Sequence, residues 1–175
     1  MTDNILTTDE RYISATHASN LKCEADKPGQ VDPIIAAGMS SSRLGASLLR
    51  LHSEYDGAPR MPAGKVTPHE FGLLLGRLKT LPAIRYDLGL QAARWGISGD
   101  VVAAVLLWWL APVCQACHGR KYELEHGAVS HRHCKSCKGT GQEVLPHGEA
   151  GRKIEDYITY CLGAARDSIG KRLRR

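Results

Sequence analysis

Apolar residues recur at helical spacing through much of the chain, and this pattern predicts a mainly α fold. Leu44, Leu48 and Leu51 share one face of a helix that we expect over about 42–55. Over about 152–173, apolar residues recur at intervals of three and four and predict a long basic final helix. Alternation with a period of two, which is typical of strands, is confined to a brief stretch around paired cysteines in the C-terminal third.

The middle of the chain carries three further helix signals. Thr67-Pro68-His69-Glu70 is a capping box with proline at the first helical position, and the helix that it begins should end at Leu81-Pro82. A second helix is expected over 83–95, ending at Gly96 in the left-handed conformation that favours glycine. The third, over about 98–110, is apolar on nearly every side, so we expect it to be buried at the centre of the fold.

The N-terminal segment has a different character. Residues 1–39 are polar, lack sustained periodicity and contain the breakers Pro28-Gly29 and Asp32-Pro33, so we expect a flexible arm. Residues 40–65 are expected to form a short helix and a linker. The remaining segment, 66–175, is predicted to be a small helical domain with an inserted four-cysteine zinc ribbon or knuckle at 114–141.

Positive charge is concentrated in the last third of the chain. Residues 114–175 carry 12 Lys/Arg and 7 Asp/Glu, whereas residues 1–113 carry 11 of each. Such an excess attracts polyanions, with nucleic acid as the first candidate, although a solvated tail would give the same count. The longest apolar run is about half the ~20 residues that span a bilayer, and the polar N-terminus lacks the apolar core of an export signal. We therefore expect a cytoplasmic protein with no membrane partner.

Four of the six cysteines form two pairs, Cys114-Gln-Ala-Cys117 and Cys134-Lys-Ser-Cys137, separated by sixteen residues. Two intervening residues allow both sulfurs of a pair to face one ion, and two such pairs complete a tetrahedral thiolate site. A glycine two places after each pair permits the turn that the backbone must make around the ion. We therefore predict one structural Zn²⁺ held by Cys114, Cys117, Cys134 and Cys137, with no open position for a catalytic water.

Other ligand sets and cysteine chemistries are less favoured. Four nearby histidines are candidates to replace a cysteine, but solvated or phosphate-facing roles are the simpler interpretation. These histidines are His118, His126, His131 and His133. A redox CxxC motif would be expected beside a βαβ pattern, and none is visible. Cys161 falls on the apolar face of the last helix and is interpreted as a core residue, and Cys23 is not interpreted as a ligand.

The cysteine pairs and their glycines resemble known zinc motifs. Cys-x-x-Cys-His-Gly at 114–119 and Cys-Lys-Ser-Cys-Lys-Gly-Thr-Gly at 134–141 are similar to the CxxCxGxG motif of the J-domain chaperones. They resemble still more the zinc-binding region of the lambdoid phage late-gene antitermination protein Q family, where an apolar helical segment precedes the first pair and another helical segment follows the second. The resemblance covers about residues 83–142. Lys121 stands where the full motif has its second glycine, and residues 1–65 show no match.

The resemblance implies a phage late-gene transcription antiterminator in the cytoplasm of a bacterial host. Such a protein binds double-stranded DNA at a late promoter, engages bacterial RNA polymerase while its sigma factor is present, and makes it read through terminators. One alternative is a zinc-stabilised nucleic-acid-binding regulator that does not modify polymerase. Another is a chaperone-like zinc adaptor that binds protein partners, although the chain has no J-domain His-Pro-Asp signature. We do not expect an enzyme, because no phosphate loop, nucleophile elbow or open metal site is found.

Basic residues near the cysteines and in the flanking helices are the candidates to contact nucleic acid, because Lys and Arg on a metal-braced loop hold phosphates in register. The candidates are Arg94, Arg120, Lys121, Arg132, Lys135, Lys138, Arg152, Lys153, Lys171, Arg172 and Arg174. A helix-turn-helix over 88–110 is an alternative, but its second helix carries Trp108 and Trp109, which suit a core better than a groove or base stacking. A core helical hairpin is favoured there, with the terminal helix from Arg152 as another potential groove reader.

Overall fold

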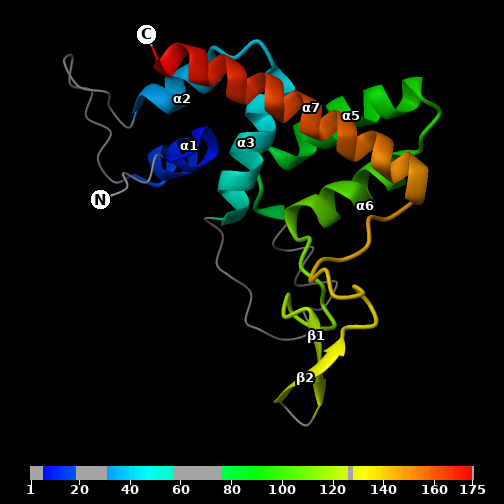
Figure 1. The fold of residues 1–175 in the computed structure, drawn as a ribbon. Helices are drawn as coiled ribbons and strands as arrows, with labels where there is room; N and C mark the ends of the chain where they lie inside the picture. The colour runs from blue at the N-terminus through cyan, green and yellow to red at the C-terminus, as the bar shows by residue number, and fades with distance from the viewer. Residues whose placement is uncertain (1–5, 19–30, 57–75, 126–127, 175) are drawn as a thin grey trace, which may run out of the picture. The chain divides into compact units, whose positions relative to one another are not determined.

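The computed structural model describes residues 6–18, 31–56, 76–125 and 128–174 (Figure 1). The chain divides into two compact units, unit 1 comprising Met1–Asp87 with Asp156–Arg175, and unit 2 comprising Leu88–Glu155. Most of the regular structure is helical, and a cluster of four cysteines lies in unit 2. The predicted fold class, mainly α with a four-cysteine insertion, is therefore confirmed. Among the described residues, no helix combines the length and apolar character that crossing a bilayer would require.

Unit 1 is built from helices. It contains α1 (Thr8–Thr16), α2 (Val31–Gly38), α3 (Arg43–Asp56), the first half of α5 (Leu81–Arg94) and the larger part of α7 (Gly148–Leu173). The buried side chains come from every one of these helices and are mostly Leu, Ile and Ala. The apolar stripes predicted for α3 and α7 are among them, including Leu48, Leu51, Ile158 and Ile169.

The N-terminal segment differs from the flexible arm expected over 1–39, because its described residues form α1 and α2. Thr7 and Glu10 make a capping box in which the Thr7 N–H donates to Glu10 Oε2 at 2.7 Å and the Glu10 N–H donates to Thr7 Oγ1 at 3.3 Å. This box satisfies backbone donors that the first turn of a helix leaves unpaired. Pro33 was expected to break regular structure, but it lies in the first turn of α2, where its missing N–H costs nothing.

Helices α3 and α7 approach each other closely at Gly45. A Cβ atom at this position would overlap the carbonyl group of Cys161 and lie 2.8 Å from Cβ of Ala165. The Ser42 hydroxyl donates to the same Cys161 carbonyl oxygen at 3.0 Å. Cys161 itself is buried, as predicted for a core residue, and the absence of a side chain at Gly45 is what permits this helix contact.

Unit 2 carries the cysteines. Its elements are the end of α5, α6 (Gly99–Leu110), the antiparallel strands β1 (Tyr122–Glu125) and β2 (Ala128–His133), and the start of α7. Gly96 ends α5 with φ of 70°, as predicted, and the Ile97 N–H donates back to the Ala92 carbonyl at 2.9 Å. No side chain of α6 from 101 to 110 is exposed, which agrees with its apolar composition.

Most predicted helix boundaries agree with the structure to within a few residues. The helix expected to end at Leu81-Pro82 is an exception, because its last helical residue is Gly76 and Leu81 begins the next helix. Helix α5 begins at Leu81 rather than after Pro82, because proline fits the first turn of a helix. Helix α7 begins at Gly148, four residues before the predicted start. The capping box at 67–70, most of the linker, Cys23 and His126 lie outside the described residues.

Candidate metal centre

The four paired cysteines converge on one point in unit 2. Their sulfur atoms all lie within 4.8 Å of one another, and each of the four residues is buried. The Sγ atoms of Cys114 and Cys134 are 4.0 Å apart, and those of Cys117 and Cys137 are 3.7 Å apart. In the described part of the chain, this is the one group of three or more Cys, His, Asp or Glu side chains placed to share an ion.

These distances match a tetrahedral thiolate site. Metal–sulfur bonds of about 2.3 Å in a regular tetrahedron place the sulfurs about 3.8 Å apart, which agrees with the separations of 3.7 and 4.0 Å. All four positions of such a site would be filled by protein sulfur. The cluster is therefore suited to a metal ion that braces the fold rather than one that activates water.

Two knuckles with the same backbone plan supply the sulfurs; we define knuckle 1 as residues 114–121 and knuckle 2 as residues 134–141. In each, the N–H three residues after the second cysteine donates back to that cysteine's carbonyl at 3.0 Å, from Arg120 in knuckle 1 and Thr140 in knuckle 2. The knuckles also pair with each other. The Cys114 N–H donates to the Gly141 carbonyl at 3.0 Å, and the Cys134 N–H donates to the Lys121 carbonyl at 2.9 Å.

Both knuckles turn through left-handed backbone conformations at matching positions. Positive φ angles occur at the first, second and fourth residues after the second cysteine, which explains the glycines noted in the sequence. The angles are 48° at His118, 78° at Gly119, 72° at Lys121, 52° at Lys138, 87° at Gly139 and 81° at Gly141. Lys121 is thus a side-chain-bearing residue in the conformation that glycine occupies in knuckle 2.

Backbone N–H groups point at the sulfurs and affect their ionisation. Burial raises the pKa of the Cys137 thiol, but the N–H groups of Gly141 and Gly139 and the neighbouring thiols outweigh it and lower the pKa to about 6. The Gly141 N–H lies 3.3 Å from Cys137 Sγ. For Cys117 burial dominates and raises the pKa to about 11. The lowered pKa of Cys137 favours the thiolate form that a metal ion requires.

The histidines considered as substitute ligands are not part of the cluster. His118, His131 and His133 are exposed, and none joins the sulfur group. The ring of His133 instead stacks on Tyr122, with centroids 5.2 Å apart and ring planes at 20°. This cross-strand pair was not predicted from the sequence. The period-two pattern around the cysteines indicated strands there, but not which residues pair across them.

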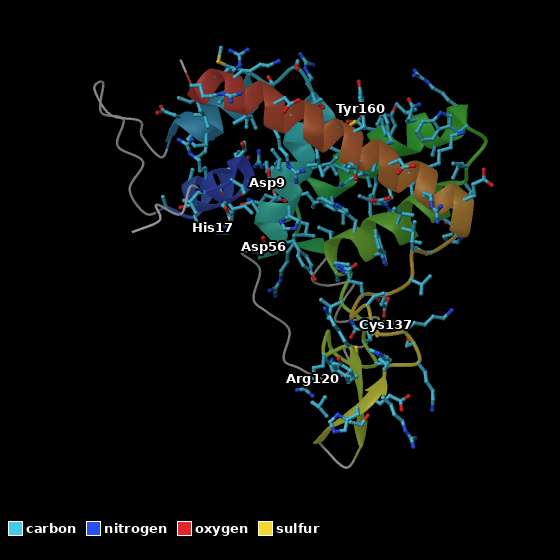
Figure 2. The ribbon with its side chains drawn as sticks, viewed as in Figure 1. Asp9, His17, Asp56, Arg120, Cys137 and Tyr160 are labelled. Carbon is cyan, nitrogen blue, oxygen red and sulfur yellow. The ribbon has the colours of Figure 1, made fainter. Side chains whose placement is uncertain are left out.

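The predicted basic candidates fall into three groups, all of them exposed. Those on the knuckles and β2 are Arg120, Lys121, Arg132, Lys135 and Lys138, and those on helices of unit 2 are Arg94, Arg152 and Lys153. A third set, Lys171, Arg172 and Arg174, ends α7 in unit 1. Figure 2 shows Arg120 and Cys137 near the end of the hairpin that adjoins the knuckles.

Some of these cations have partners within the chain. Lys135 Nζ lies 3.4 Å from a Glu123 carboxylate oxygen, with a strongly exposed lysine side chain. Lys153 Nζ lies 5.1 Å from the ring centroid of Trp95, a cation–π distance. Both contacts hold a positive charge in place at the surface of unit 2 without burying it.

The pair α5–α6 has a short turn, but its second helix is a poor groove reader. Helix α6 contains no Lys or Arg. Trp108 is half-buried, and its indole N–H donates to the Glu143 carbonyl at 2.8 Å, so this ring braces the segment after knuckle 2. These features agree with the favoured core hairpin rather than with a DNA-reading helix-turn-helix over 88–110.

Comparison of the chain with known protein families, with curated proteins and with solved structures finds no match.

Proposed function

We propose that this protein is a zinc-stabilised DNA-binding protein that acts as a phage late-gene transcription antiterminator. The observation that carries the proposal is the closed four-sulfur cluster, bordered by exposed cations on both knuckles. Zinc is the ion that most often takes four tetrahedral thiolates in structural sites, so we assign it to the cluster. The ion would supply cohesion to the knuckles and no bond-breaking chemistry.

The cations support DNA as the partner. Residues 114–141 carry five Lys/Arg and two Asp/Glu, so the module has a net charge of +3. A metal-braced loop keeps such charges at fixed positions, which reduces the side-chain and backbone ordering that binding would otherwise require. Contacts of this kind set position and affinity on the phosphate backbone, whereas sequence reading needs further contacts with bases.

The step on RNA polymerase is proposed from the resemblance to the antitermination protein Q family. It would take place in the cytoplasm of a bacterial host, on polymerase that still carries its sigma factor. The alternative of a DNA-binding regulator that leaves polymerase unmodified shares the same zinc module. A chaperone-like adaptor would use the module to contact protein and would bind DNA without strong salt dependence.

Two measurements test the proposal in order. The first is the affinity of the zinc-loaded full chain for duplex DNA between 50 and 200 mM salt; we expect a steep fall, with a log–log slope of about −0.9 for each phosphate contact. Lys135→Ala with Arg132→Ala should reduce that slope by about 1–2, whereas Lys79→Ala, at an exposed site in unit 1, should leave it unchanged. Salt-independent binding would point to the adaptor instead.

The second measurement is terminator read-through by bacterial RNA polymerase holoenzyme on a phage late-promoter template. The proposal expects more full-length transcript with the protein than without it, and no gain with the metal-free protein. Equal termination in both reactions, together with retained DNA binding, would select the regulator that does not modify polymerase.

A further inference from the structure

The β1–β2 hairpin presents a stacked aromatic pair to solvent. Tyr122 and His133 are partners across the two strands, and their rings are 5.2 Å apart and nearly parallel. The His133 ring also lies against knuckle 2, where a Cβ on Gly139 would approach its Nδ1 to 2.6 Å. The histidine is thus held between Gly139 and Tyr122, and this contact fixes the tyrosine ring relative to the metal centre.

The face that carries this pair has an unusual composition for an exposed surface. On β2, His133 pairs with Tyr122 and Val129 pairs with Leu124, two residues further along β1, and His131 lies in the bulged stretch between them. Val129 is 54% exposed and Tyr122 is 36% exposed, and both histidines are exposed. The exposed surface of β2 therefore combines imidazole rings with an apolar side chain and has no carboxylate.

Basic residues flank the hairpin in the chain. Arg120 and Lys121 precede Tyr122 directly in the chain, and Lys135 and Lys138 follow β2 on knuckle 2. Proteins that bind single-stranded nucleic acid combine aromatic rings, on which the bases stack, with positive charges that pair with the phosphates. The hairpin and its flanking residues supply both. By contrast, reading base edges in a duplex groove relies on Arg, Lys, Asn or Gln, and Arg132 is the one such residue of β2.

From this arrangement we infer that the Tyr122–His133 face of the hairpin binds an unpaired base of a single DNA strand by stacking on Tyr122. The inference rests on the proposed function in one respect: a protein that works on DNA opened by polymerase meets such a strand there. The flanking Arg120 and Lys121 bind the phosphates on either side of the stacked base. Stacking tolerates any base, so the contact gives affinity with little sequence preference.

The test uses the zinc-loaded full chain and three fluorescein-labelled probes. These are a 20-nucleotide oligo-dT DNA strand, an oligo-U RNA strand of the same length and a mixed-sequence 20-bp DNA duplex. Tyr122→Leu should weaken binding of the dT strand by about 5- to 150-fold, which is the range for loss of one aromatic stack. Duplex affinity should change less than twofold. Tyr122→Phe keeps the ring and should bind dT like the parent. Tyr86→Leu, at a tyrosine on α5 that is 68% exposed, is the matched control and should change neither affinity.

A dT strand with a single 5-bromouracil can be photo-crosslinked to the unsubstituted protein, and the crosslinked peptide then identifies the residues that contact the base. Photo-crosslinking to the peptide that contains Tyr122 supports the inference, and crosslinks confined to other peptides overturn it. Unchanged dT binding by metal-loaded Tyr122→Leu also overturns it, as does equal loss in Tyr122→Phe. Binding of U at least tenfold tighter than dT would reject DNA as the strand. Failure of these tests with salt-sensitive duplex binding intact refutes only the inference, whereas no binding to any probe refutes the proposed function too.

Discussion

The backbone N–H of Cys134, the first cysteine of knuckle 2, donates to the carbonyl oxygen of Lys121 at 2.9 Å. Lys121 is the last residue of knuckle 1. The reciprocal bond runs from Cys114 to Gly141 at 3.0 Å. The two acceptors occupy the same left-handed conformation, yet one is lysine and the other is glycine. This difference makes the two positions a direct test of the backbone plan.

Replacing Lys121 by glycine should stabilise the knuckles. Relief of left-handed strain at φ of 72° is worth about 1–2 kcal/mol, and the extra freedom of glycine in the unfolded chain costs about 0.4–1 kcal/mol. The net gain should be about 0.5–1 kcal/mol, measured by chelator competition or thermal unfolding of the metal-loaded protein. Lys121→Ala removes the same charge but keeps Cβ, so it is the control and should give no gain.

The opposite change at Gly141 should be damaging. A Cβ there would lie 2.9 Å from the Gly119 carbonyl oxygen, at a φ of 81°. We expect Gly141→Ala to destabilise the metal-loaded module by about 1–3 kcal/mol and to speed loss of the metal to a chelator. A variant that holds metal as long as the parent would contradict the close contact between the knuckles.

Removal of the metal should unfold the knuckles. Structural zinc contributes about 10–16 kcal/mol of apparent binding energy at neutral pH, which exceeds the stability of most small domains. Native mass spectrometry should find one ion per chain, and a chelator should raise amide exchange across residues 113–142. Cys114→Ser should abolish the bound ion, whereas Cys161→Ala, at a buried site in unit 1, should keep it.

Gly45, the one glycine of α3, should not tolerate a side chain. Its Cβ would overlap the Cys161 carbonyl, so Gly45→Ala should lower the free energy of unfolding by about 1–3 kcal/mol or more as the helices separate. Gly163→Ala in α7 is the control, because outside the adjacent backbone of its own helix no atom lies within 4 Å of its added Cβ. That control should be neutral or stabilising by up to about 1 kcal/mol, as expected for glycine replaced by alanine within a helix. Thermal unfolding of both variants checks the contrast.

The capping box of α1 gives a test of the N-terminal segment. Thr7→Ala removes the acceptor for the Glu10 N–H and should cost about 1 kcal/mol of stability in thermal unfolding. Ser14→Ala, at an exposed position in the same helix, should cost nothing, because alanine is the better helix former. Equal effects from both substitutions would argue against a folded α1.

The sequence was sufficient to predict the cysteine cluster, because the spacing within each pair and the glycines after it leave few other geometries. The apolar stripes of α3, α6 and α7 were predictable for a similar reason, since each helix buries a continuous face. Helix α1 was missed although Thr7 and Glu10 carry its signal, because its few apolar residues are Tyr12, Ile13 and Ala15 and only two are buried. Arg166 donates two hydrogen bonds to the Asp9 carboxylate, at 2.8 and 2.5 Å. These residues are far apart in the sequence, so no local pattern could indicate the contact.

The reciprocal bonds between the knuckles have a consequence for how this module varies. Because both ends of the sixteen residues between the pairs are fixed by sulfur and by main-chain bonds, the span behaves as a tethered loop on a rigid frame. Exposed side chains on its strands are therefore replaceable with little effect on the frame. New ligand preferences could arise by exchanging those side chains alone, while the metal keeps the architecture constant.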